Sequence, residues 1–487
     1  MGPDEVHPRI LKEAATVLAP SLHTLFRLSL ATGSLPATWN EATVIPIYKS
    51  GDRLNPVSFR PISLTSVPCK MLERLIKRSV MQHLQQHNLI SPSQHGFVPG
   101  RSCITNLLMF MDSLTQAHDD GLITDAVFFD FAKAFDKVPH APLLAKLESY
   151  GIHGEALLWI ASFLTGRSFR VRVDSVLSSS SPVSSGVPQG SVLGPILFLI
   201  YINDLPEVLS SNCLLYADDL KIWNSDDPNI LQQDTDAVKH WSEEWHLPLN
   251  LSKCAHMSLG GDSGNLFVFH DERCSLSIPS DMCRKDLGVL IDTSLSFSHH
   301  TRATSAKAYR TLKMIKRTFP SISKSEFHIL FGTYVRPLLK YANSVVYTLL
   351  KKYIGVSERI QRAATKMVHG MHRLDYSSRM SLLDLYPLDQ RRLRGDLILA
   401  YSFFHFGQSR GSLHLFSHGS SKGTRQEAVQ ASLSHGATTE FFSIRVISPW
   451  NALPPQISQV PSLPIFKHLI YIHLGLRRST SIDVIVP

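Results

Sequence analysis

The residues best suited to chemistry are two adjacent aspartates in an apolar stretch, LLYADDLKIW, at 214–223. Asp218 and Asp219 have apolar residues on both sides, and a buried carboxylate is costly unless something compensates its charge. A third acid, Asp130, lies in another apolar stretch, AVFFDF, 88 residues earlier than Asp218. If the two stretches are neighbouring strands of one sheet, three carboxylates meet at one place.

Carboxylates this close cannot all stay ionised without a positive counter-charge. Mg²⁺ can supply it, because this ion prefers hard oxygen ligands, commonly one or two carboxylates together with substrate phosphates. Two such ions about 3.5–4 Å apart stabilise the attacking and the leaving oxygen of a phosphoryl transfer. The aspartates therefore predict metal-dependent phosphoryl transfer, although Asp130 taken alone is better explained as a turn or capping residue.

The apolar pattern predicts the elements that position these acids. Asp218 and Asp219 belong to a strand–turn–strand segment at 213–223, because aspartate is depleted in strands and favours the turn. Asp130 closes a strand at 125–131. The pattern also predicts helices at 4–31, 67–87, 155–165 and 229–245, a buried helix within 191–209, strands at 43–48 and 169–173, and a strand or hairpin arm at 285–292.

The charge of the chain is uneven. Its net charge is +9, and residues 301–400 hold 19 Lys and Arg against 6 Asp and Glu. Beyond about residue 295 the pattern is helical, with Lys307, Arg310, Lys313 and Arg317 on one face. A basic segment joined to an acidic centre predicts a polyanionic partner near a cation site. A solubilising surface is the alternative.

Composition also bounds the class of protein. With 44% hydrophobic and 18% charged residues, the chain is expected to be globular. Its six cysteines show no C-x-x-C spacing, which favours free thiols in a reducing compartment over a zinc site. The N-terminus, MGPDEVHPRI, lacks the apolar core of a signal peptide. The longest apolar run, 192–202, is far shorter than the ~20 residues of a membrane helix, so a soluble or peripheral protein is expected.

Three ordered motifs, FFDFAKAFDKVPH, SSGVPQGSVLGPILFLIYINDLP and LLYADDLKIW, resemble consecutive motifs of reverse transcriptases. The stretches GPDEVHPRILKE, VIPIYKSGD, FRPISLTSVPCKMLERLI, SQHGFVPGRSC and RVISPWNALP are similar to the polymerases of non-LTR (LINE-like) retrotransposons of the jockey and CR1 groups. A lone YADD would be unspecific, whereas the ordered set covers nearly the whole chain. Because the resemblance to a polymerase starts near Met1, the endonuclease domain usual in such elements is not expected, and the chain resembles a truncated copy.

The resemblance implies roles for the acids. Asp130 and Asp218 would be shared ligands of two Mg²⁺ ions, with Mn²⁺ as the alternative ion, assisted by the backbone carbonyl of Phe131. Asp219 would be the adjacent supporting acid. The reaction would be attack of a primer 3′-hydroxyl on the α-phosphate of a dNTP. Lys253 in NLSKC would protonate the leaving pyrophosphate, with a solvated lysine at a strand end as an equal alternative.

The resemblance also implies a site for the dNTP and template, formed by Lys49, Arg60, Phe135, Gly186, Gln189 and Gly190. Lys49 and Arg60 would contact the triphosphate, and Phe135 would exclude a ribose 2′-hydroxyl. Gln189 would lie beside the nascent base pair, and the two glycines would let the backbone approach the nucleotide. The alternatives are core packing for Phe135, a glycine turn for the loop and a surface position for Arg60.

The fold implied is α+β, a right-hand polymerase with fingers, a palm built on an antiparallel sheet and a thumb, followed by a mainly helical basic C-terminal region. The expected domains are an N-terminal helical extension of the fingers at 1–28, a reverse transcriptase domain at 29–292, a thumb and connection region at 293–407, a flexible linker or loop at 408–439 and a C-terminal region at 440–487.

The function implied is RNA-directed DNA polymerase activity serving retrotransposition. The alternatives are a catalytically silent nucleic-acid-binding relic and a maturase-like RNA-binding protein. The expected partners are an RNA template, a DNA primer or duplex, dNTPs and an RNA-binding protein encoded by the same element, and no membrane is expected. Action in the nucleus, after synthesis in the cytoplasm, is expected from the family.

Overall fold

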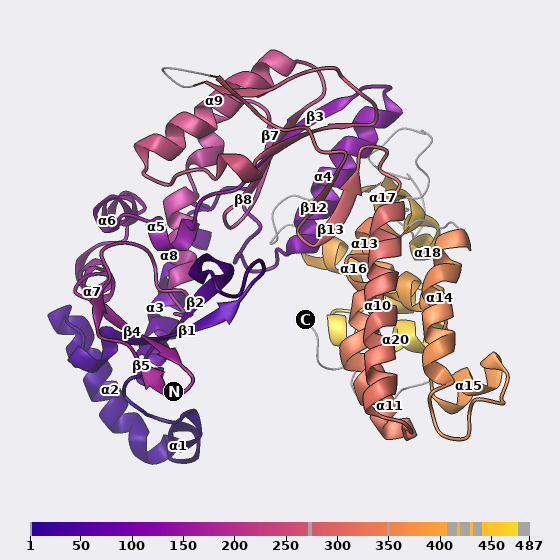
Figure 1. The fold of residues 1–487 in the computed structure, drawn as a ribbon, viewed down its shortest axis with the longest axis horizontal. Helices are drawn as coiled ribbons and strands as arrows, with labels where there is room; N and C mark the ends of the chain where they lie inside the picture. The colour runs from indigo at the N-terminus through magenta and orange to yellow at the C-terminus, as the bar shows by residue number, and fades with distance from the viewer. Residues whose placement is uncertain are drawn as a thin grey trace. The chain divides into compact units, whose positions relative to one another are not determined.

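The computed structural model describes residues 2–270, 275–347, 351–406, 416–418, 429–431 and 441–475. The chain divides into two compact units. The first comprises Met1–Val98, Val127–His256 and Leu266–Pro279, and the second comprises Pro99–Ala126, Met257–Asn265 and Ser280–Pro487. Helices alternate with strands in the first unit, whereas helices dominate the second (Figure 1). The α+β class predicted from the sequence is confirmed.

The first unit contains most of the elements predicted before residue 280. Its helices are α1 (Pro8–Glu13), α2 (Ala15–Thr32), α3 (Val67–Gln86), α5 (Ala134–Lys137), α6 (His140–Ser149), α7 (Gly154–Leu164), α8 (Gly194–Ile202) and α9 (Pro228–Glu244). Its strands are β1 (Glu41–Tyr48), β2 (Phe59–Leu64), β4 (Ser168–Val173), β5 (Val176–Leu177), β6 (Ser181–Pro182), β7 (Asn212–Tyr216), β8 (Asp219–Asn224), β10 (Val268–His270) and β11 (Ser275–Ser277).

One sheet has the strand order β2-β1-β4-β5, and β6 also pairs with β4. β1 runs antiparallel to β2, with Ile47 opposite Arg60, and parallel to β4. Beyond β1 the backbone N–H of Lys49 donates to the carbonyl of Ser58 at 2.8 Å. The pairing therefore brings Lys49 and Arg60 to the same end of the β1–β2 pair, although they are eleven positions apart.

A second sheet has the order β7-β8-β3-β9, in which β3 spans Thr124–Phe129 and β9 spans Ala255–Leu259. β7 and β8 form an antiparallel hairpin with Tyr216 opposite Asp219, so Ala217 and Asp218 make a two-residue turn. β8 lies next to β3, which ends just before Asp130. The prediction that the two acidic stretches are neighbouring strands is confirmed.

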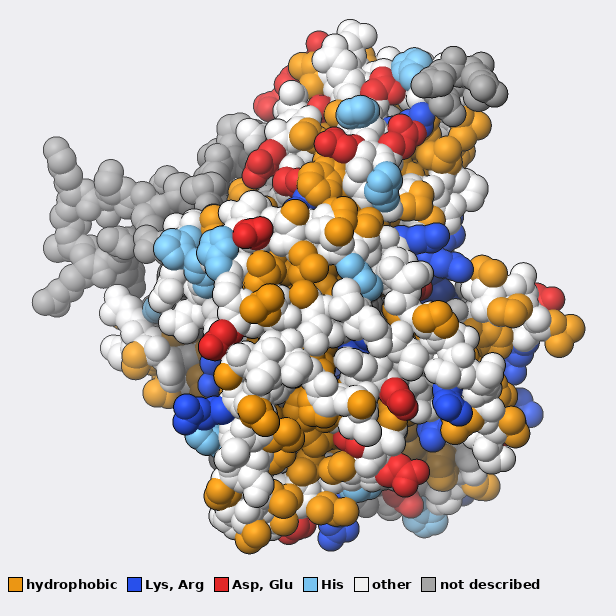
Figure 2. All heavy atoms as spheres, turned by 90° about the vertical axis from the view of Figure 1, so that its left-hand side faces the viewer, with side chains coloured by type: hydrophobic (Ala, Val, Ile, Leu, Met, Phe, Trp, Pro, Cys, Tyr) orange, Lys and Arg blue, Asp and Glu red, His pale blue; other side chains and the backbone are white. Residues whose placement is uncertain are grey.

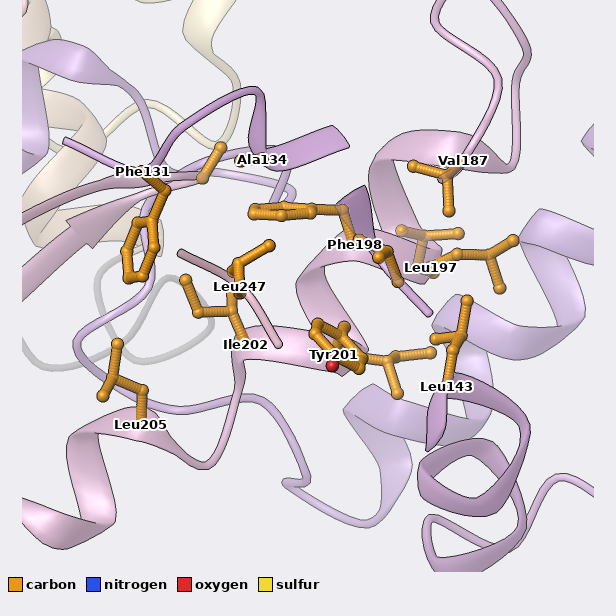
Figure 3. Packing of buried hydrophobic residues seen from close by; sticks show 14 of the residues in the cluster. Phe131, Ala134, Leu143, Val187, Leu197, Phe198, Tyr201, Ile202, Leu205 and Leu247 are labelled. Atoms are coloured by element: carbon orange, nitrogen blue, oxygen red, sulfur yellow. The ribbon is translucent and has the colours of Figure 1, made fainter. Parts of the chain in front are cut away.

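The core of the first unit is centred on α8, which is apolar on every side. All but one of its residues are buried, as the run GPILFLIYI predicts. Figure 3 shows side chains of α8, including Phe198 and Tyr201, among Phe131, Val187 and Leu143 from other elements. Each large apolar side chain buried here contributes about 1.5–3 kcal/mol. This rigid centre supports the strand ends that carry the acids.

The N-terminal helical stretch predicted at 4–31 forms two helices, α1 and α2, that meet at Ala14. Among the described residues of α2 only Ser29 is buried, where its hydroxyl accepts a hydrogen bond of 2.9 Å from the Nε1–H of Trp159. Val17 and Leu28 stay 77% and 61% exposed. Hydrophobic side chains gather on the lower part of the face in Figure 2, where these helices lie.

The second unit is mainly helical. Its helices are α4 (Cys103–Asp119), α10 (Ser298–Thr318), α11 (Lys324–Leu330), α12 (Arg336–Lys340), α13 (Asn343–Val346), α14 (Lys351–Thr365), α15 (Tyr376–Leu382), α16 (Leu388–Phe406), α17 (Phe442–Arg445), α18 (Ile447–Asn451), α19 (Pro455–Ser458) and α20 (Leu463–His473). A π-helical turn, Phe331–Val335, links α11 to α12. Two hairpins are formed by β12 (Cys283–Asp286) with β13 (Val289–Asp292) and by β14 (Phe416–His418) with β15 (Val429–Ala431).

Helix α10 carries the predicted basic face. Lys307, Arg310, Lys313 and Arg317 are all exposed, while Leu312 and Ile315 on the opposite side enter a hydrophobic core. That core also holds Phe327 of α11. The helical, basic character predicted beyond residue 295 is therefore observed.

A buried ion pair fixes the segment 441–451 to α16. The guanidinium of Arg445 donates from Nε and Nη2 to Oδ2 of Asp396, both at 3.0 Å, and the hydroxyl of Ser344 donates to Oδ1 at 2.9 Å. The side chains of Arg445 and Asp396 are only 4% and 3% exposed. Arg445 belongs to the RVISPWNALP motif, so part of that motif serves the architecture of the second unit.

Most of the predicted linker, 408–439, lies outside the described residues. The described residues within it form the short strands β14 and β15. Within the part of the chain that is described, no helix is both long and apolar enough to cross a membrane. The five described cysteines are free thiols.

Candidate active site

The β7–β8 turn presents Asp218 at the tip of a hairpin. Ala217, the first turn residue, has φ +58°, which is the left-handed region that glycine usually occupies. A positive φ at the first central position is characteristic of type II′ turns, whose twist matches that of hairpin strands. Asp218 is half-buried, and Asp219, the first residue of β8, is exposed.

Asp130 follows the buried strand β3. Its backbone carbonyl accepts a hydrogen bond of 2.7 Å from the N–H of Asn250, and Ala132 donates to Pro248 at 2.8 Å. These two bonds flank a bridge between Phe131 and Leu249, which leaves the carbonyl of Phe131 outside the bridge's own bonds. The side chain of Asp130 is 32% exposed.

Lys253 is an ion-pair partner of Asp130. Its Nζ lies 3.1 Å from Oδ2 of Asp130. The lysine side chain is 57% exposed, so solvent weakens this interaction. The sequence predicted Lys253 as a proton donor to pyrophosphate, and the structure brings it to the carboxylate of Asp130.

The charges around Asp218 mark the centre of the site. Burial raises the pKa of the Asp218 carboxyl above its usual range, and the negative charge of Asp130 raises this pKa further. A backbone hydrogen bond and the positive charges of Arg60 and Lys49 act in the opposite direction. Asp218 thus has one acidic and two basic neighbours, all of them predicted site residues.

The fit of divalent ions to these residues can be judged from the donors. Asp130 and Asp218 are neighbouring carboxylates that the protein itself compensates incompletely, and the carbonyl of Phe131 adds a hard oxygen close by. In the described part of the chain, no three His, Cys, Asp or Glu side chains already form a metal-binding cluster. The pair therefore fits an ion that takes two protein carboxylates and completes its coordination with water or phosphate. The role of Asp219 as a supporting acid stays a prediction.

The loop 186–190 packs closely against the backbone of Asp136 and the backbone of Ser63. Gly186 has φ +90°, and a Cβ there would lie 2.6 Å from the carbonyl oxygen of Asp136. Gly190 has φ +107°, and a Cβ there would lie 2.6 Å from the carbonyl oxygen of Ser63. Both positions therefore require glycine for contacts within the protein. Their predicted role in approaching a nucleotide stays a prediction.

Gln189 is held by one hydrogen bond of its side chain and one of its backbone carbonyl. Its Nε2 donates to Oδ1 of Asp136 at 2.9 Å, and its carbonyl accepts from the N–H of Ser63 at 2.8 Å. Burial raises the pKa of Asp136, and the bond from Gln189 opposes that rise. Because Ser63 belongs to β2, the loop is tied to the strand that carries Arg60.

Phe135 is half-buried beside this loop. Its ring stacks on Phe198 of α8 at 4.5 Å, and the ring of Phe97 meets it edge-on at 6.3 Å. The N–H of Val187 donates to the carbonyl of Phe135 at 2.7 Å. Phe135 is therefore both a core residue and a fixed aromatic surface next to Gln189. Its predicted role as a gate stays a prediction.

Sequence reasoning missed Glu73, which holds the loop from behind. This residue is fully buried in α3, and its Oε2 accepts hydrogen bonds from the N–H groups of Val192 and Leu193 at 2.6 and 2.9 Å. Burial raises the pKa of Glu73, and these bonds together with Arg167 oppose the rise. A signal was available, because Glu73 stands on the apolar face of its helix, four residues after Cys69 and three before Ile76.

Comparison with known proteins agrees with the family that the sequence motifs indicate. Residues 47–312 match the family "Reverse transcriptase (RNA-dependent DNA polymerase)". The chain belongs to the reverse transcriptase family. Members of this family use divalent metal ions. The predictions of a reverse transcriptase and of its right-hand polymerase fold are confirmed.

Among curated relatives, the chain is 27% identical over 391 residues to the RNA-directed DNA polymerase from mobile element jockey of Drosophila melanogaster. That alignment covers 76% of this chain and 42% of the relative. The jockey polymerase of Drosophila funebris is 31% identical over 293 residues, covering 57% of this chain and 31% of the relative. The chain thus spans less than half the length of these relatives, and its similarity to jockey-type polymerases is confirmed.

A solved structure, apo telomerase from Candida tropicalis, is 12% identical, with a TM-score of 0.43 and coverage of 76% of this chain and 66% of that chain. A likeness at this level says nothing further about the present chain.

Proposed function

We propose that the protein is an RNA-directed DNA polymerase that extends a primer 3′-hydroxyl with dNTPs. The observation that carries this proposal is the pair Asp130 and Asp218 at adjacent strand ends, within electrostatic reach of Lys49 and Arg60. Two carboxylates facing two cations suit a substrate that arrives as a metal-bound triphosphate. Membership of the reverse transcriptase family supports the same assignment.

Asp130 and Asp218, with the carbonyl of Phe131, are the groups that would hold divalent ions, which we propose to be two Mg²⁺. Such ions supply the positive charge that stabilises the attacking and leaving oxygens. Asp219 is proposed as a supporting acid. The protein's own contribution is positioning. Reacting atoms that are already held in line lose less translational and rotational entropy on reaching the transition state.

The remaining residues act on the nucleotide. Lys49 and Arg60, at one end of the β1–β2 pair, would bind the triphosphate. Gln189 would lie beside the base pair with its amide fixed by Asp136. The fixed ring of Phe135 would exclude a ribose 2′-hydroxyl, and Gly186 and Gly190 shape the loop around it.

Lys253 is proposed to give its proton to the leaving pyrophosphate. In the protein alone its ammonium pairs with Asp130. Cations bound between the carboxylates would take over that compensation, and the exposed lysine would then turn towards the product. The lysine side chain is 57% exposed, so solvent already weakens its pairing with Asp130.

The proposed partners are an RNA template, a DNA primer and dNTPs, with the basic face of α10 on the nucleic acid backbone. An RNA-binding protein encoded by the same element is a further proposed partner. Nuclear action follows from the proposal, because chromosomal DNA would supply the primer.

A primer-extension assay tests the function. Purified protein is incubated with a labelled DNA primer on an RNA template, dNTPs and Mg²⁺, and product length is followed. We expect extension to the template end. Folded protein that binds the duplex yet adds no nucleotide with Mg²⁺ or Mn²⁺ would instead identify the silent nucleic-acid-binding relic. Phe135→Val should increase ribonucleotide incorporation in this assay, and unchanged selectivity would remove the gate from the proposal.

A further inference from the structure

The segment 93–96, within the SQHGF sequence, lies alongside β7. The N–H of Leu215 donates to the carbonyl of Ser93 at 2.9 Å, and the N–H of His95 donates to the carbonyl of Leu215 at 2.8 Å. These bonds form a parallel bridge between Gln94 and Leu215. The bridge covers the edge of the sheet next to the Asp218 turn, since β7 is an outer strand of the four.

The side chain of Gln94 continues from this bridge into the turn itself. Its Oε1 accepts hydrogen bonds from the N–H of Ala217 at 2.9 Å and from the N–H of Gly96 at 2.7 Å. Its Nε2 donates to the carbonyl of Ala217 over a longer distance of 3.4 Å. Gln94 is 1% exposed, so no competing water is expected at these groups.

This amide contacts the one turn residue whose backbone is strained. Ala217 has φ +58°, and a left-handed conformation is unfavourable for a residue other than glycine. A buried N–H left without an acceptor is a second cost. Gln94 relieves the second cost only when Ala217 adopts the conformation in which its N–H meets Oε1, so it stabilises that conformation selectively.

Gly96 fixes how closely the segment approaches the turn. A Cβ at this position would lie 2.3 Å from the backbone N of Ala217, a distance that non-bonded atoms do not reach. The glycine therefore lets the segment rest directly on the turn, and the length of the Gln94 side chain then matches the gap. The side chain of Gln94 and the missing side chain of Gly96 thus both act on the backbone N–H of Ala217.

We propose that Gln94 is a positioning residue that holds the Asp218 carboxylate in its metal-binding orientation. Asp218 follows Ala217 directly, so a change of φ at Ala217 would swing its carboxylate away from Asp130. This inference deepens the proposed function and rests on it for the identity of the metal site. The competing explanation is that Gln94 satisfies buried amides and stabilises the fold without affecting metal binding.

Three variants separate these explanations. Gln94→Met keeps the length of the side chain and removes both polar atoms. Ala217→Gly, combined with Gln94→Met, removes the penalty for the left-handed conformation and should let the turn form without the amide. Gln86→Met makes the same chemical change at an exposed position at the end of α3 and is the matched control.

Mn²⁺ binding is measured by electron paramagnetic resonance on the protein without nucleic acid, and primer extension is measured across a Mg²⁺ titration. For Gln94→Met we expect about tenfold weaker Mn²⁺ binding and about tenfold more Mg²⁺ at half-maximal rate, the effect of ~1.4 kcal/mol. The KM for dNTP should stay within about twofold, because the Gln189 loop is untouched. The added Ala217→Gly should recover a large part of the loss, and Gln86→Met should match wild type.

Loss of melting temperature in Gln94→Met without a change in metal dependence would overturn the proposal and leave a stabilising role. Absence of rescue by Ala217→Gly would also overturn it. If wild type binds Mn²⁺ but extends no primer, the proposed function fails while the Mn²⁺ data still decide the role of Gln94. If wild type binds no Mn²⁺, both fail.

Discussion

Each unit of the molecule holds buried or half-buried carboxylates, and the two units compensate them differently. In the second unit, Asp396 receives two donors from Arg445 and one from Ser344, all inside the protein. In the first unit, Asp130 meets an exposed lysine, and Asp218 has a pKa raised by burial and by Asp130. Asp396, with its internal partners, serves the architecture of the second unit, whereas the exposure of Asp130 and the like charge beside Asp218 suit the metal site that we propose.

The comparison predicts opposite consequences of neutralising an acid in the two units. At Asp396 the change would leave a buried guanidinium without its partner. At Asp218 the change would remove a charge that the folded protein alone does not favour. Function and stability should therefore separate between the two sites.

The largest expected effect is that of Asp218→Asn on catalysis. If Asp218 binds metal as proposed, loss of its carboxylate removes several kcal/mol of transition-state stabilisation, which corresponds to a rate at least ~10³-fold lower. Primer extension under single-turnover conditions measures this. The melting temperature of the metal-free variant should equal or exceed that of wild type at pH 8, because the raised pKa of Asp218 means that its ionised form is disfavoured there.

Asp174→Asn, at an exposed position between β4 and β5, is the control and should leave both the rate and the melting temperature unchanged. Extension by Asp218→Asn within tenfold of wild type would contradict the assignment of Asp218 as a metal ligand.

The next effect in size is that of Arg445→Met on stability. Removing Arg445 leaves the buried Asp396 without its ion-pair partner and costs about 3–5 kcal/mol. Urea unfolding should show this loss, whereas Arg359→Met at an exposed position of α14 should change stability by less than ~0.5 kcal/mol. The double variant Arg445→Met/Asp396→Leu should recover most of the loss. A double variant as unstable as the single one would indicate that packing, rather than charge, dominates here.

Asp112 of α4 is another acid of the second unit, half-buried and without an ion-pair partner among the described residues, and its pKa makes stability depend on pH. Its carboxylate accepts a hydrogen bond of 3.2 Å from Ser443, and burial raises its pKa to about 6. The folded state therefore binds this proton more tightly than the unfolded state, so stability is lost as pH rises from about 4 to above 6. The loss approaches ~3 kcal/mol in full, at 1.36 kcal/mol per pKa unit.

Asp112→Asn should thus stabilise the protein by about 1–3 kcal/mol at pH 8 and by nothing measurable near pH 4. Urea unfolding at the two pH values measures the difference, with Asp174→Asn as the surface control. A gain that is equal at both pH values would mean that charge burial at Asp112 is not its source.

The smallest expected effect is that of Glu73→Gln, an acid compensated by main-chain N–H groups. Charge-assisted bonds to Val192 and Leu193 become neutral ones and the neighbouring Arg167 loses a counter-charge, whereas the burial that raises the pKa of Glu73 no longer opposes a charge. These changes act in opposite directions, so stability should change by less than about 1 kcal/mol. Because these bonds hold the Gln189 loop, the KM for dNTP should rise a few-fold while half-saturating Mg²⁺ stays constant. Glu148→Gln, an exposed position on α6, is the control. A shift in Mg²⁺ dependence would show that the loop and the metal turn are not independent.

Much of the site could be read from the sequence because its signals are local. An acid pair in an apolar hairpin predicted the β7–β8 turn, and an acid closing an apolar strand predicted the end of β3. The pairing of β1 with β2, which brings Lys49 to the Arg60 end of β2, was not predicted and was found only in the structure. Local periodicity was also sufficient for α3, α7, α8 and α9.

The residues that hydrogen-bond to the backbone of the site could not be found from local sequence patterns. Gln94 acts on Ala217 across 123 positions, and Glu73 acts on Val192 across 119. Such contacts depend on how distant segments come together, and a glutamine or glutamate has no spacing that reveals its distant acceptor or donor. The same holds for Arg445, whose motif was recognised but whose partner Asp396 was not.

The Arg445–Asp396 pair has a practical consequence for handling the protein. At 1 M salt the Debye length falls to about 3 Å, so contacts between exposed lysines and arginines and a phosphate backbone are largely screened. A pair whose side chains are 4% and 3% exposed is screened far less. Concentrated salt should therefore strip co-purifying nucleic acid from the basic face of α10 during isolation while the second unit stays folded.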